Sequence, residues 1–154
     1  MRIVGGKFKG RGLKTPSSYV VRPTSDRLRE TVFNILAHAY DHACEGARVI
    51  DLFAGTGALG IEALSRGATL ALFVDDSNEG RALLRANTEA LGLGGITRIM
   101  RRDATKLGPM PPQEPFNLVF LDPPYGRDLA PRALVSLKEG VWLSDGALLS
   151  LIHI

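Results

Sequence analysis

The residues with the clearest chemical potential are Asp122, Pro123, Pro124 and Tyr125, which directly follow the apolar segment 116–121. An apolar segment that stops at an acid and two prolines is typical of a buried strand that ends abruptly. The proline rings fix the backbone, so carbonyls without a sheet partner are held ready to accept hydrogen bonds. Asp122 adds a charged acceptor, and Tyr125 adds an aromatic face. Together these groups suit a flat substrate that carries N–H groups, and the alternative is a strand end followed by a plain turn.

An acidic residue stands at or just beyond the end of every predicted strand. The strands are predicted at residues 47–53, 69–74, 97–102 and 116–121, and the acids are Asp51, Asp75, Asp103 and Asp122. Strands and helices alternate along this part of the chain, which predicts an α/β fold whose mostly parallel sheet has helices on both faces. Because ligands of such sheets bind at the carboxyl ends of the strands, the four carboxylates are expected to border one site.

The glycine-rich segment 51–60, with the sequence DLFAGTGALG, follows the first of these strands. It contains a GxGxxG pattern, and Asp75 follows Gly55 at the spacing expected for an acid that binds a ribose. Both features suit either a dinucleotide or S-adenosyl-L-methionine. Asp51 distinguishes them, because a carboxylate before the glycine loop would repel a pyrophosphate but attract the ammonium and sulfonium of S-adenosyl-L-methionine. Charge therefore favours the methyl donor.

Individual roles follow from this choice of ligand. Gly55 and Gly57 would let the backbone approach the cofactor, and Asp75 would accept hydrogen bonds from the ribose hydroxyls. Asp103 and the Ala104 amide would recognise the edge of the adenine. Each acid taken alone is equally compatible with a helix cap or a turn. The predicted cofactor-binding residues are Asp51, Phe53, Ala54, Gly55, Gly57, Asp75, Asp103 and Ala104.

Positive charge is concentrated at the N-terminus. Residues 1–35 contain eight basic and two acidic side chains, a net charge of +6, whereas the remaining chain has a net charge of −3. A basic arm on a mildly acidic body is the electrostatic pattern of a protein that binds a polyanion, and a merely solvated arm is the alternative. Residues 1–23 are predicted to form a basic hairpin arm and residues 24–154 the main domain. The side chains expected to contact the polyanion are Lys7, Lys9, Arg11, Lys14, Arg22, Arg27 and Arg29.

A helix is predicted to follow the arm, with its N-cap at Thr24 or Ser25. Its core-facing stripe is predicted to consist of Leu28, Val32, Ile35, Leu36 and Ala39.

Length and composition limit the class of protein. With 154 residues, 45% of them hydrophobic, the chain fits one globular domain. Its single cysteine excludes an internal disulfide and offers no metal cluster, so a cytoplasmic protein without a metal is expected. The apolar segments are too short to cross a bilayer, so no membrane partner is expected.

Several of these segments resemble a known family. The Asp-Pro-Pro-Tyr sequence at 122–125 is similar to the catalytic motif of class I S-adenosyl-L-methionine-dependent methyltransferases that act on a planar nitrogen. More narrowly, residues 5–13 (GGKFKGRGL), 22–30 (RPTSDRLRE), 33–34 and 51–57 (DLFAGTG) resemble the RsmD family over nearly the whole chain. One departure is Asp75, where the family often carries a glutamate.

The resemblance implies a Rossmann-like methyltransferase fold and methylation of a guanine N2 in 16S ribosomal RNA, and a monomer is expected. The RNA would belong to a small ribosomal subunit or an assembly intermediate, and the basic arm would hold its phosphates. Asp122 and the Pro123 carbonyl would accept hydrogen bonds from the guanine N–H groups, and Tyr125 would stack on the base. A DNA adenine-N6 or cytosine-N4 methyltransferase and a non-catalytic RNA-binding assembly factor are the alternatives.

The C-terminus departs from the family pattern. The family continues past a fifth strand with further strands, whereas this chain stops at Ile154, so C-terminal strands are expected to be missing. Residues 149–154, LSLIHI, resemble the translation of a transposon end used as a sequencing adapter, and we interpret them as an artefact of a truncated gene. The alternative is a genuine apolar strand.

Overall fold

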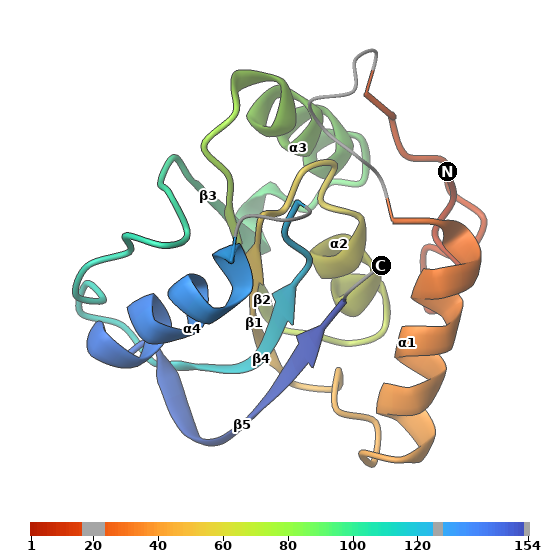
Figure 1. Cartoon of the computed structure of the whole chain (residues 1–154). Coiled ribbons are helices and arrows are strands. Elements are labelled where there is room, and N and C mark those ends of the chain that lie inside the picture. The colour runs from red at the N-terminus through yellow and green to blue at the C-terminus, as the bar shows by residue number, and fades with distance from the viewer. Residues whose placement is uncertain (17–23, 125–127, 153–154) are drawn as a thin grey trace.

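Helices and strands alternate along most of the chain (Figure 1). The structure, a computed structural model, describes residues 1–16, 24–124 and 128–152. In these ranges the elements are α1 (Asp26–His38), β1 (Arg48–Leu52), α2 (Ala58–Ser65), β2 (Leu70–Val74), α3 (Asn78–Ala90), the 3₁₀ helix η1 (Gly94–Ile96), β3 (Thr97–Met100), β4 (Phe116–Leu121), α4 (Leu129–Glu139) and β5 (Leu143–Leu151).

The strands form one sheet in the order β3-β2-β1-β4-β5, and all neighbouring pairs are parallel. The predicted parallel sheet is therefore confirmed. In register, Asp51 on β1 lies beside Phe73 on β2 and Phe120 on β4. The chain leaves β1 toward β2 on one side and later returns to β4 on the other. This reversal opens a crevice outside the carboxyl ends of β1 and β4, the usual ligand site of such folds.

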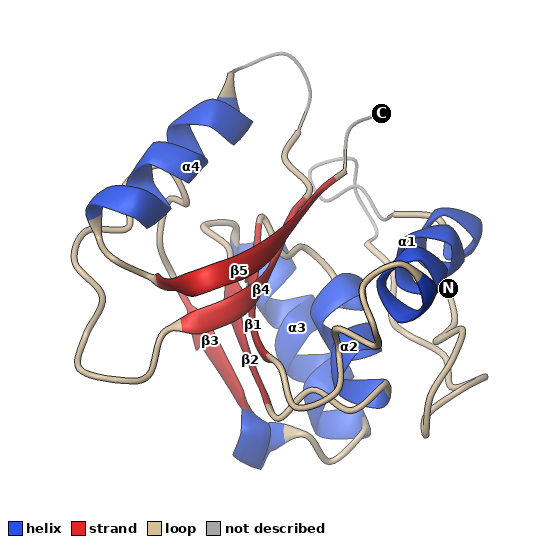
Figure 2. Cartoon of the chain, turned by 90° about the horizontal axis from the view of Figure 1, so that it is seen from below, coloured by secondary structure: helices blue, strands red, loops and turns tan. Residues whose placement is uncertain are grey.

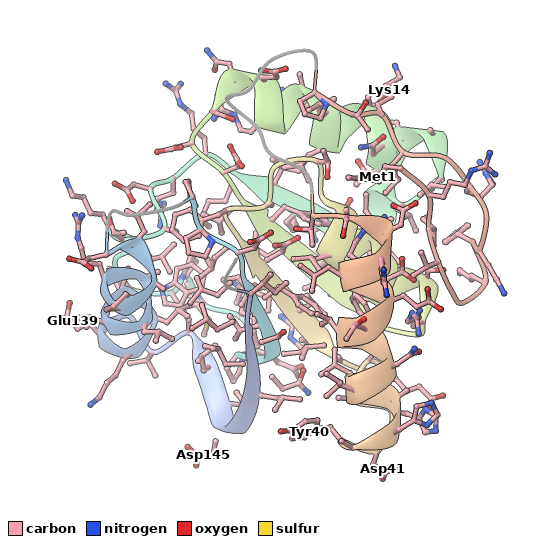
Figure 3. All side chains as sticks on the ribbon, turned by 45° about the vertical axis from the view of Figure 1, so that its right-hand side comes forward. Met1, Lys14, Tyr40, Asp41, Glu139 and Asp145 are labelled. Carbon is pink, nitrogen blue, oxygen red and sulfur yellow. The ribbon has the colours of Figure 1, made fainter. Side chains whose placement is uncertain are left out.

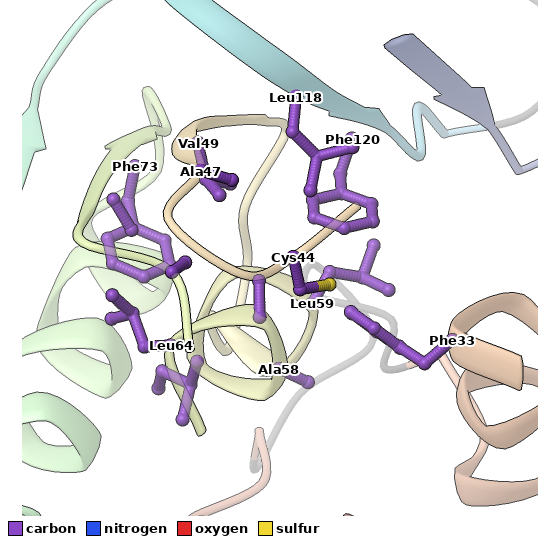
Figure 4. Packing of buried hydrophobic residues seen from close by; sticks show 14 of the residues in the cluster. Phe33, Cys44, Ala47, Val49, Ala58, Leu59, Leu64, Phe73, Leu118 and Phe120 are labelled. Carbon is purple, nitrogen blue, oxygen red and sulfur yellow. The ribbon is translucent and has the colours of Figure 1, made fainter. Parts of the chain in front are cut away.

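The central strands β1, β2 and β4 are buried along most of their length, as expected for the apolar strands of a parallel sheet, whereas the edge strand β5 is partly exposed. Figure 2 shows α4 on one face and α1, α2 and α3 on the other, which confirms the predicted layers. Residues such as Val49, Phe73 and Phe120 point into the core under α1 to α3, and Phe33 of α1 reaches toward the same cluster (Figure 4). The strand residues that point to the opposite face, such as Ile50 and Val119, pack with Leu137 of α4 in a second core cluster.

The predicted boundaries agree with the structure to within two residues. The strand 116–121 is as predicted, and Ser25 is the N-cap of α1 because its hydroxyl accepts a hydrogen bond from the Leu28 amide. The first three predicted strands are one or two residues shorter, which is the ordinary uncertainty of element ends.

The predicted apolar stripe of α1 was partly wrong. Leu36 is buried as expected, but Ile35 is 50% exposed and Ala39 lies at the exposed C-cap. The buried residues of α1 are Arg29, Phe33 and Leu36. The helix is therefore rotated relative to the prediction, because a buried acid on α2 accepts the Arg29 charge and lets this side of α1 face the core.

The N-terminal arm forms a short antiparallel pairing that packs on α2. Ile3 donates its amide to the Arg11 carbonyl at 2.9 Å, Leu13 donates to the Met1 carbonyl at 2.9 Å, and both apolar side chains are buried. The Lys7 amide donates to the Ser65 carbonyl at the end of α2, also at 2.9 Å. The predicted hairpin therefore contributes to the core, and its lysines remain on the outer side.

The C-terminal segment continues the sheet. Leu149 lies beside Val119 and Leu151 beside Leu121 in the parallel β4–β5 pair, and the Ile152 amide donates to the Leu121 carbonyl at 2.9 Å. Residues 149–151 therefore lie in β5, whereas 153–154 lie outside the described residues, and the interpretation of 149–154 as an artefact stays a prediction. Within the described ranges, no helix is long and apolar enough to span a membrane.

Candidate active site

A small pocket opens at the crevice between the carboxyl ends of β1 and β4. It is lined by side chains from the start of α1, from the loop and helix after β1, and from the tip of β4: Thr24, Phe53, Ala54, Thr56, Ala58, Leu59 and Asp122. The fold thus brings the predicted cofactor loop and the predicted catalytic acid to one place, although Phe53 and Asp122 are 69 positions apart in the sequence.

Asp51 is the buried acid behind this pocket. One carboxylate oxygen, Oδ2, accepts a hydrogen bond from the Gly60 amide at 3.0 Å, and the other, Oδ1, has no partner among the described residues. Burial raises the pKa of Asp51 well above its ordinary value, and the nearby charges of Asp122 and Asp75 raise it further. A cationic ligand beside Asp51 would stabilise its ionised form and offset both the burial and the neighbouring negative charges. The electrostatics of the site therefore favour a positively charged ligand.

The backbone between β1 and α2 turns sharply to expose the glycine loop. Phe53 has a φ of 58°, Gly55 of 57° and Gly57 of 81°, so three of five consecutive residues are left-handed. A non-glycine residue in that region is strained, and such strain is concentrated at ligand sites. A Cβ on Gly57 would also come within 2.5 Å of the Leu84 side chain. Gly57 is therefore favoured by both its φ and its close packing, Gly55 by its φ, and Phe53 and Ala54 contribute to the pocket wall.

Asp75 connects the glycine loop to the end of β2. Its Oδ2 accepts a hydrogen bond from the Gly55 amide at 2.8 Å, and its Oδ1 accepts from both the amide and the hydroxyl of Ser77 at 2.8 Å. Ser77 in turn caps α3 by accepting from the Gly80 amide. Asp75 thus fixes the loop and the start of α3, and its predicted contact with a ribose remains a prediction.

Asp103 lies beyond β3, on the same edge of the sheet. Its Oδ1 accepts hydrogen bonds from the Thr105 amide at 2.8 Å and from the Thr105 hydroxyl at 2.7 Å. These bonds, together with the nearby charges of Lys106 and Arg132, lower the pKa of Asp103. Ala104 is buried beside it. Asp103 therefore stays ionised. An ionised carboxylate is suited to the predicted role, which is to accept a hydrogen bond from the adenine amino group.

Asp122 stands at the tip of β4, one residue past the pairing of Leu121 with Leu52. Its Oδ2 accepts a short hydrogen bond from the hydroxyl of Thr24, the buried residue two positions before α1. Pro123 is half-buried and Pro124 is exposed, whereas Tyr125 lies outside the described residues. The sequence predicted the acid but missed Thr24 as its partner, since no short-range signal relates residues 98 positions apart.

The predicted polyanion-binding side chains divide into two groups. Those exposed on the arm and on α1 are Lys7, Lys9, Arg11, Lys14 and Arg27. Figure 3 shows Lys14 at the outer surface near α3. Arg22 lies outside the described residues.

The prediction for Arg29 was wrong. Its side chain is fully buried and pairs with Glu62 at 3.1 Å, so it cannot reach a phosphate. The sequence missed this ion pair because Arg29 and Glu62 lie on different helices, and no local pattern indicates that they meet.

Comparisons with known proteins agree over nearly the whole chain. The family described as Conserved hypothetical protein 95 matches residues 1–153. The ribosomal RNA small subunit methyltransferase D of Escherichia coli K12 is 39% identical over 97% of this chain and 72% of its own length. The enzyme of the same name from Haemophilus influenzae is 36% identical over 97% of this chain and 76% of its own length.

Solved structures show the same fold. The Escherichia coli protein yhhF superposes with a TM-score of 0.81 at 36% sequence identity, over 98% of this chain and 78% of its own. A methyltransferase from Thiobacillus denitrificans, solved with S-adenosyl-L-homocysteine, has a TM-score of 0.64 at 18% identity, over 88% of this chain and 51% of its own. The second likeness extends to the fold alone.

Proposed function

Since this chain belongs to the ribosomal RNA small subunit methyltransferase D family, described as Conserved hypothetical protein 95, we propose that it methylates a guanine N2 in 16S ribosomal RNA. The methyl donor is S-adenosyl-L-methionine. The proposed substrate is a small ribosomal subunit or an assembly intermediate, and the proposed working form is a monomer.

The observation that carries the proposal is the buried carboxylate of Asp51. Its Oδ1 has no hydrogen-bond partner among the described residues, and its pKa is raised by burial and by two neighbouring acids. A buried acceptor of this kind requires a donor, and a positively charged donor compensates best. The ammonium group of S-adenosyl-L-methionine has this chemistry, whereas a pyrophosphate would be repelled.

The residues around Asp51 fit the rest of the cofactor. Gly55 and Gly57 leave the approach to the loop without Cβ atoms, and Phe53 and Ala54 offer apolar surface at the pocket wall. Asp75 and Asp103, at the ends of the next two strands, would receive the ribose hydroxyls and the adenine edge. When bound, the cofactor supplies a methyl group on a sulfonium, an electrophile that needs no metal.

Asp122 and its proline carbonyls would hold the acceptor nitrogen. The guanine amino lone pair is delocalised into the ring, so the acceptors must favour a more pyramidal nitrogen by gripping its N–H groups. With the cofactor bound, its methyl carbon would leave sulfur as it bonds to this nitrogen. The proton released from nitrogen passes to Asp122 or to water. Alignment of nitrogen, carbon and sulfur supplies much of the rate.

The first test measures transfer of tritiated methyl groups from S-adenosyl-L-methionine. The substrates are small ribosomal subunits that lack the modification, protein-free 16S RNA, and duplex DNA. We expect transfer to the subunits, and digestion of the RNA to nucleosides should yield N2-methylguanosine. Transfer to DNA instead would favour the DNA methyltransferase alternative, and failure to bind the cofactor by calorimetry would refute the enzyme assignment.

A second test separates the catalytic acid from the cofactor site. Asp122→Ala should lower kcat by about 100-fold or more, because an acceptor that positions the nitrogen is lost. Its affinity for S-adenosyl-L-methionine should stay within about threefold of the wild type, since Asp51 and the glycine loop are intact. Asp145→Ala, an exposed change on β5, is the matched control and should alter neither quantity. Equal losses of affinity and of rate in Asp122→Ala would contradict this role.

A further inference from the structure

The hydroxyl of Thr24 bonds to the predicted catalytic carboxylate from outside the sheet. Thr24 precedes α1 and is buried, and its Oγ1 donates to Oδ2 of Asp122 at the tip of β4. Both side chains line the same pocket. A bond to one oxygen of a carboxylate restricts its rotation and so fixes the direction of the other oxygen. Because misplacement of a reacting group by about 1 Å can reduce a rate about 100-fold, this restriction bears directly on catalysis.

The position of Thr24 is fixed in turn by Arg29. The Arg29 Nε donates to the Thr24 carbonyl at 3.4 Å, and its Nη2 donates to the Arg2 carbonyl at 2.9 Å. Its Nη1 donates to Glu62 on α2 at 3.1 Å. The planar guanidinium makes these bonds from one rigid group, which a lysine could not reproduce. Arg29 therefore holds the start of α1 in a defined place relative to α2 and the arm.

Glu62 completes the connection to the N-terminal arm. Its fully buried carboxylate also accepts the Val4 amide at 3.0 Å, the Gly5 amide at 2.9 Å and the Arg66 Nε at 3.0 Å. Each oxygen thus has two donors, and the buried charge is compensated. Figure 1 shows the N-terminal segment beside the start of α1. A continuous series of hydrogen bonds therefore runs from the arm to the tip of β4.

We propose that Thr24 is a positioning residue, which orients the Asp122 carboxylate toward the acceptor nitrogen, and that the buried Arg29–Glu62 pair holds Thr24 in place. The inference rests on the proposed methyl transfer for its catalytic consequence. The contact itself can be tested without activity. On this proposal, the N-terminal arm and the tip of β4 are connected through Thr24, and both help to define the position of the Asp122 carboxylate.

The kinetic test compares Thr24→Val, Thr24→Ser and the control Thr31→Val. Thr31 is an exposed threonine of α1 whose hydroxyl donates to the Arg27 carbonyl of the same helix. On small subunits, Thr24→Val should lower kcat about tenfold with an unchanged KM for S-adenosyl-L-methionine. Thr24→Ser keeps the hydroxyl and should stay within about twofold of the wild type, as should Thr31→Val. A wild-type kcat in Thr24→Val, or equal losses in both Thr24 variants, would overturn the proposal.

Arg29→Lys tests the second half of the proposal. The lysine keeps a positive charge beside Glu62 but has no guanidinium, so the hydrogen bond to the Thr24 carbonyl is lost. We therefore expect kcat to fall severalfold. In the Thr24→Val background the same change should have little further effect, because the two residues act through one contact. Independent, multiplicative losses would remove Arg29 from this role.

Thermal unfolding tests the contact without any substrate. Thr24→Val should lower Tm by about 4 °C in the wild-type background and by much less in an Asp122→Ala background. Equal shifts in both backgrounds would refute the contact and with it the inference. If the coupling is found but the wild type methylates no RNA, the proposed function fails and only the structural link remains.

Discussion

Three fully buried ionisable side chains differ in whether their charges are satisfied within the protein. Arg29 and Glu62 compensate one another and bond to surrounding backbone groups, so both are satisfied within the protein. Asp51 is equally buried, but its Oδ1 has no partner among the described residues. Burial and the nearby charges of Asp122 and Asp75 raise the pKa of Asp51. At the scale of single residues, this unsatisfied buried acid is the feature on which the proposed cofactor site rests.

Asp51→Asn should stabilise the cofactor-free protein while it weakens the cofactor site. The asparagine Oδ1 can still accept the Gly60 amide, but it carries no buried charge. Since folding raises the pKa of Asp51 above 3.8, the stability that the protonated carboxyl contributes is present below that pH and is lost as pH rises through the raised pKa. The Tm of the variant should therefore exceed that of the wild type increasingly as pH rises from about 4 to 8.

The measurement is a set of melting curves from pH 4 to pH 8 for both proteins, with a titration of S-adenosyl-L-methionine at pH 7.5. Affinity for the cofactor should fall by at least about tenfold, because an ion pair with the ammonium is lost. A constant Tm difference across the pH range would show that Asp51 does not titrate as expected.

At the scale of elements, two helices connect the pocket to the rest of the fold. α2 begins in the glycine loop, and it carries the buried Glu62 on the side that meets the arm and α1. α1 begins beside Thr24, so its first turn borders the pocket. A change in the docking of either helix therefore reaches the site through its N-terminus.

Gly57→Ala should disturb the start of α2. A side chain at a φ of 81° is strained, and its Cβ would lie 2.5 Å from the Leu84 side chain. The expected loss is about 2–4 kcal/mol in the free energy of unfolding, measured in urea. Gly95→Ala is the matched control, since its Cβ would meet nothing within 4 Å at an ordinary φ. Equal stability of the two variants would contradict the required geometry at Gly57.

Arg29→Met should destabilise the junction of α1, α2 and the arm. The substitution keeps an apolar stem but leaves Glu62 buried with Arg66 as its remaining charged partner. We expect a loss of about 3 kcal/mol in the free energy of unfolding, toward the lower end for a broken buried ion pair. Arg27→Met, two positions earlier and exposed, should change it by less than about 0.5 kcal/mol. A similar small effect at Arg29 would contradict a structural role.

At the scale of the whole molecule, the basic arm is attached to the domain whose sheet topology forms the pocket. The basic arm packs on α2 and passes α3, where Lys14 donates its amide to Asn87 at 2.7 Å. The arm is thus attached to the same domain that contains the pocket. Its exposed lysines therefore have a fixed position relative to the pocket. RNA held by the arm would be presented to the sheet edge at a defined distance.

Binding to 16S RNA should weaken as salt rises if the arm contacts phosphates. Replacing Lys7, Lys9 and Arg11 together by glutamine should reduce the slope of log K against log salt by about 2, since each single-strand phosphate contact contributes about 0.7. Filter binding from low to high salt measures this slope. Lys138→Gln, at the exposed end of α4, is the control and should leave it nearly unchanged. An unaltered slope in the triple variant would exclude phosphate contacts by these residues.

The sequence alone determined the alternation of helices and strands, the parallel sheet and the acids at the strand ends. These follow from local periodicity and from turn residues such as Gly57, which act over a few positions. It also indicated the ligand through Asp51, because the charge of a residue beside a glycine loop is a local fact.

Only the tertiary structure decided which residues meet across the chain. It placed Arg29 in the core rather than on the surface, rotated the buried face of α1, and joined Thr24 to Asp122. An arginine has the same helix propensity and charge in either position, and the deciding factor is a compensating acid 33 residues away on another helix. Burial of a charge depends on such a partner, and the partner is provided by packing rather than by local sequence.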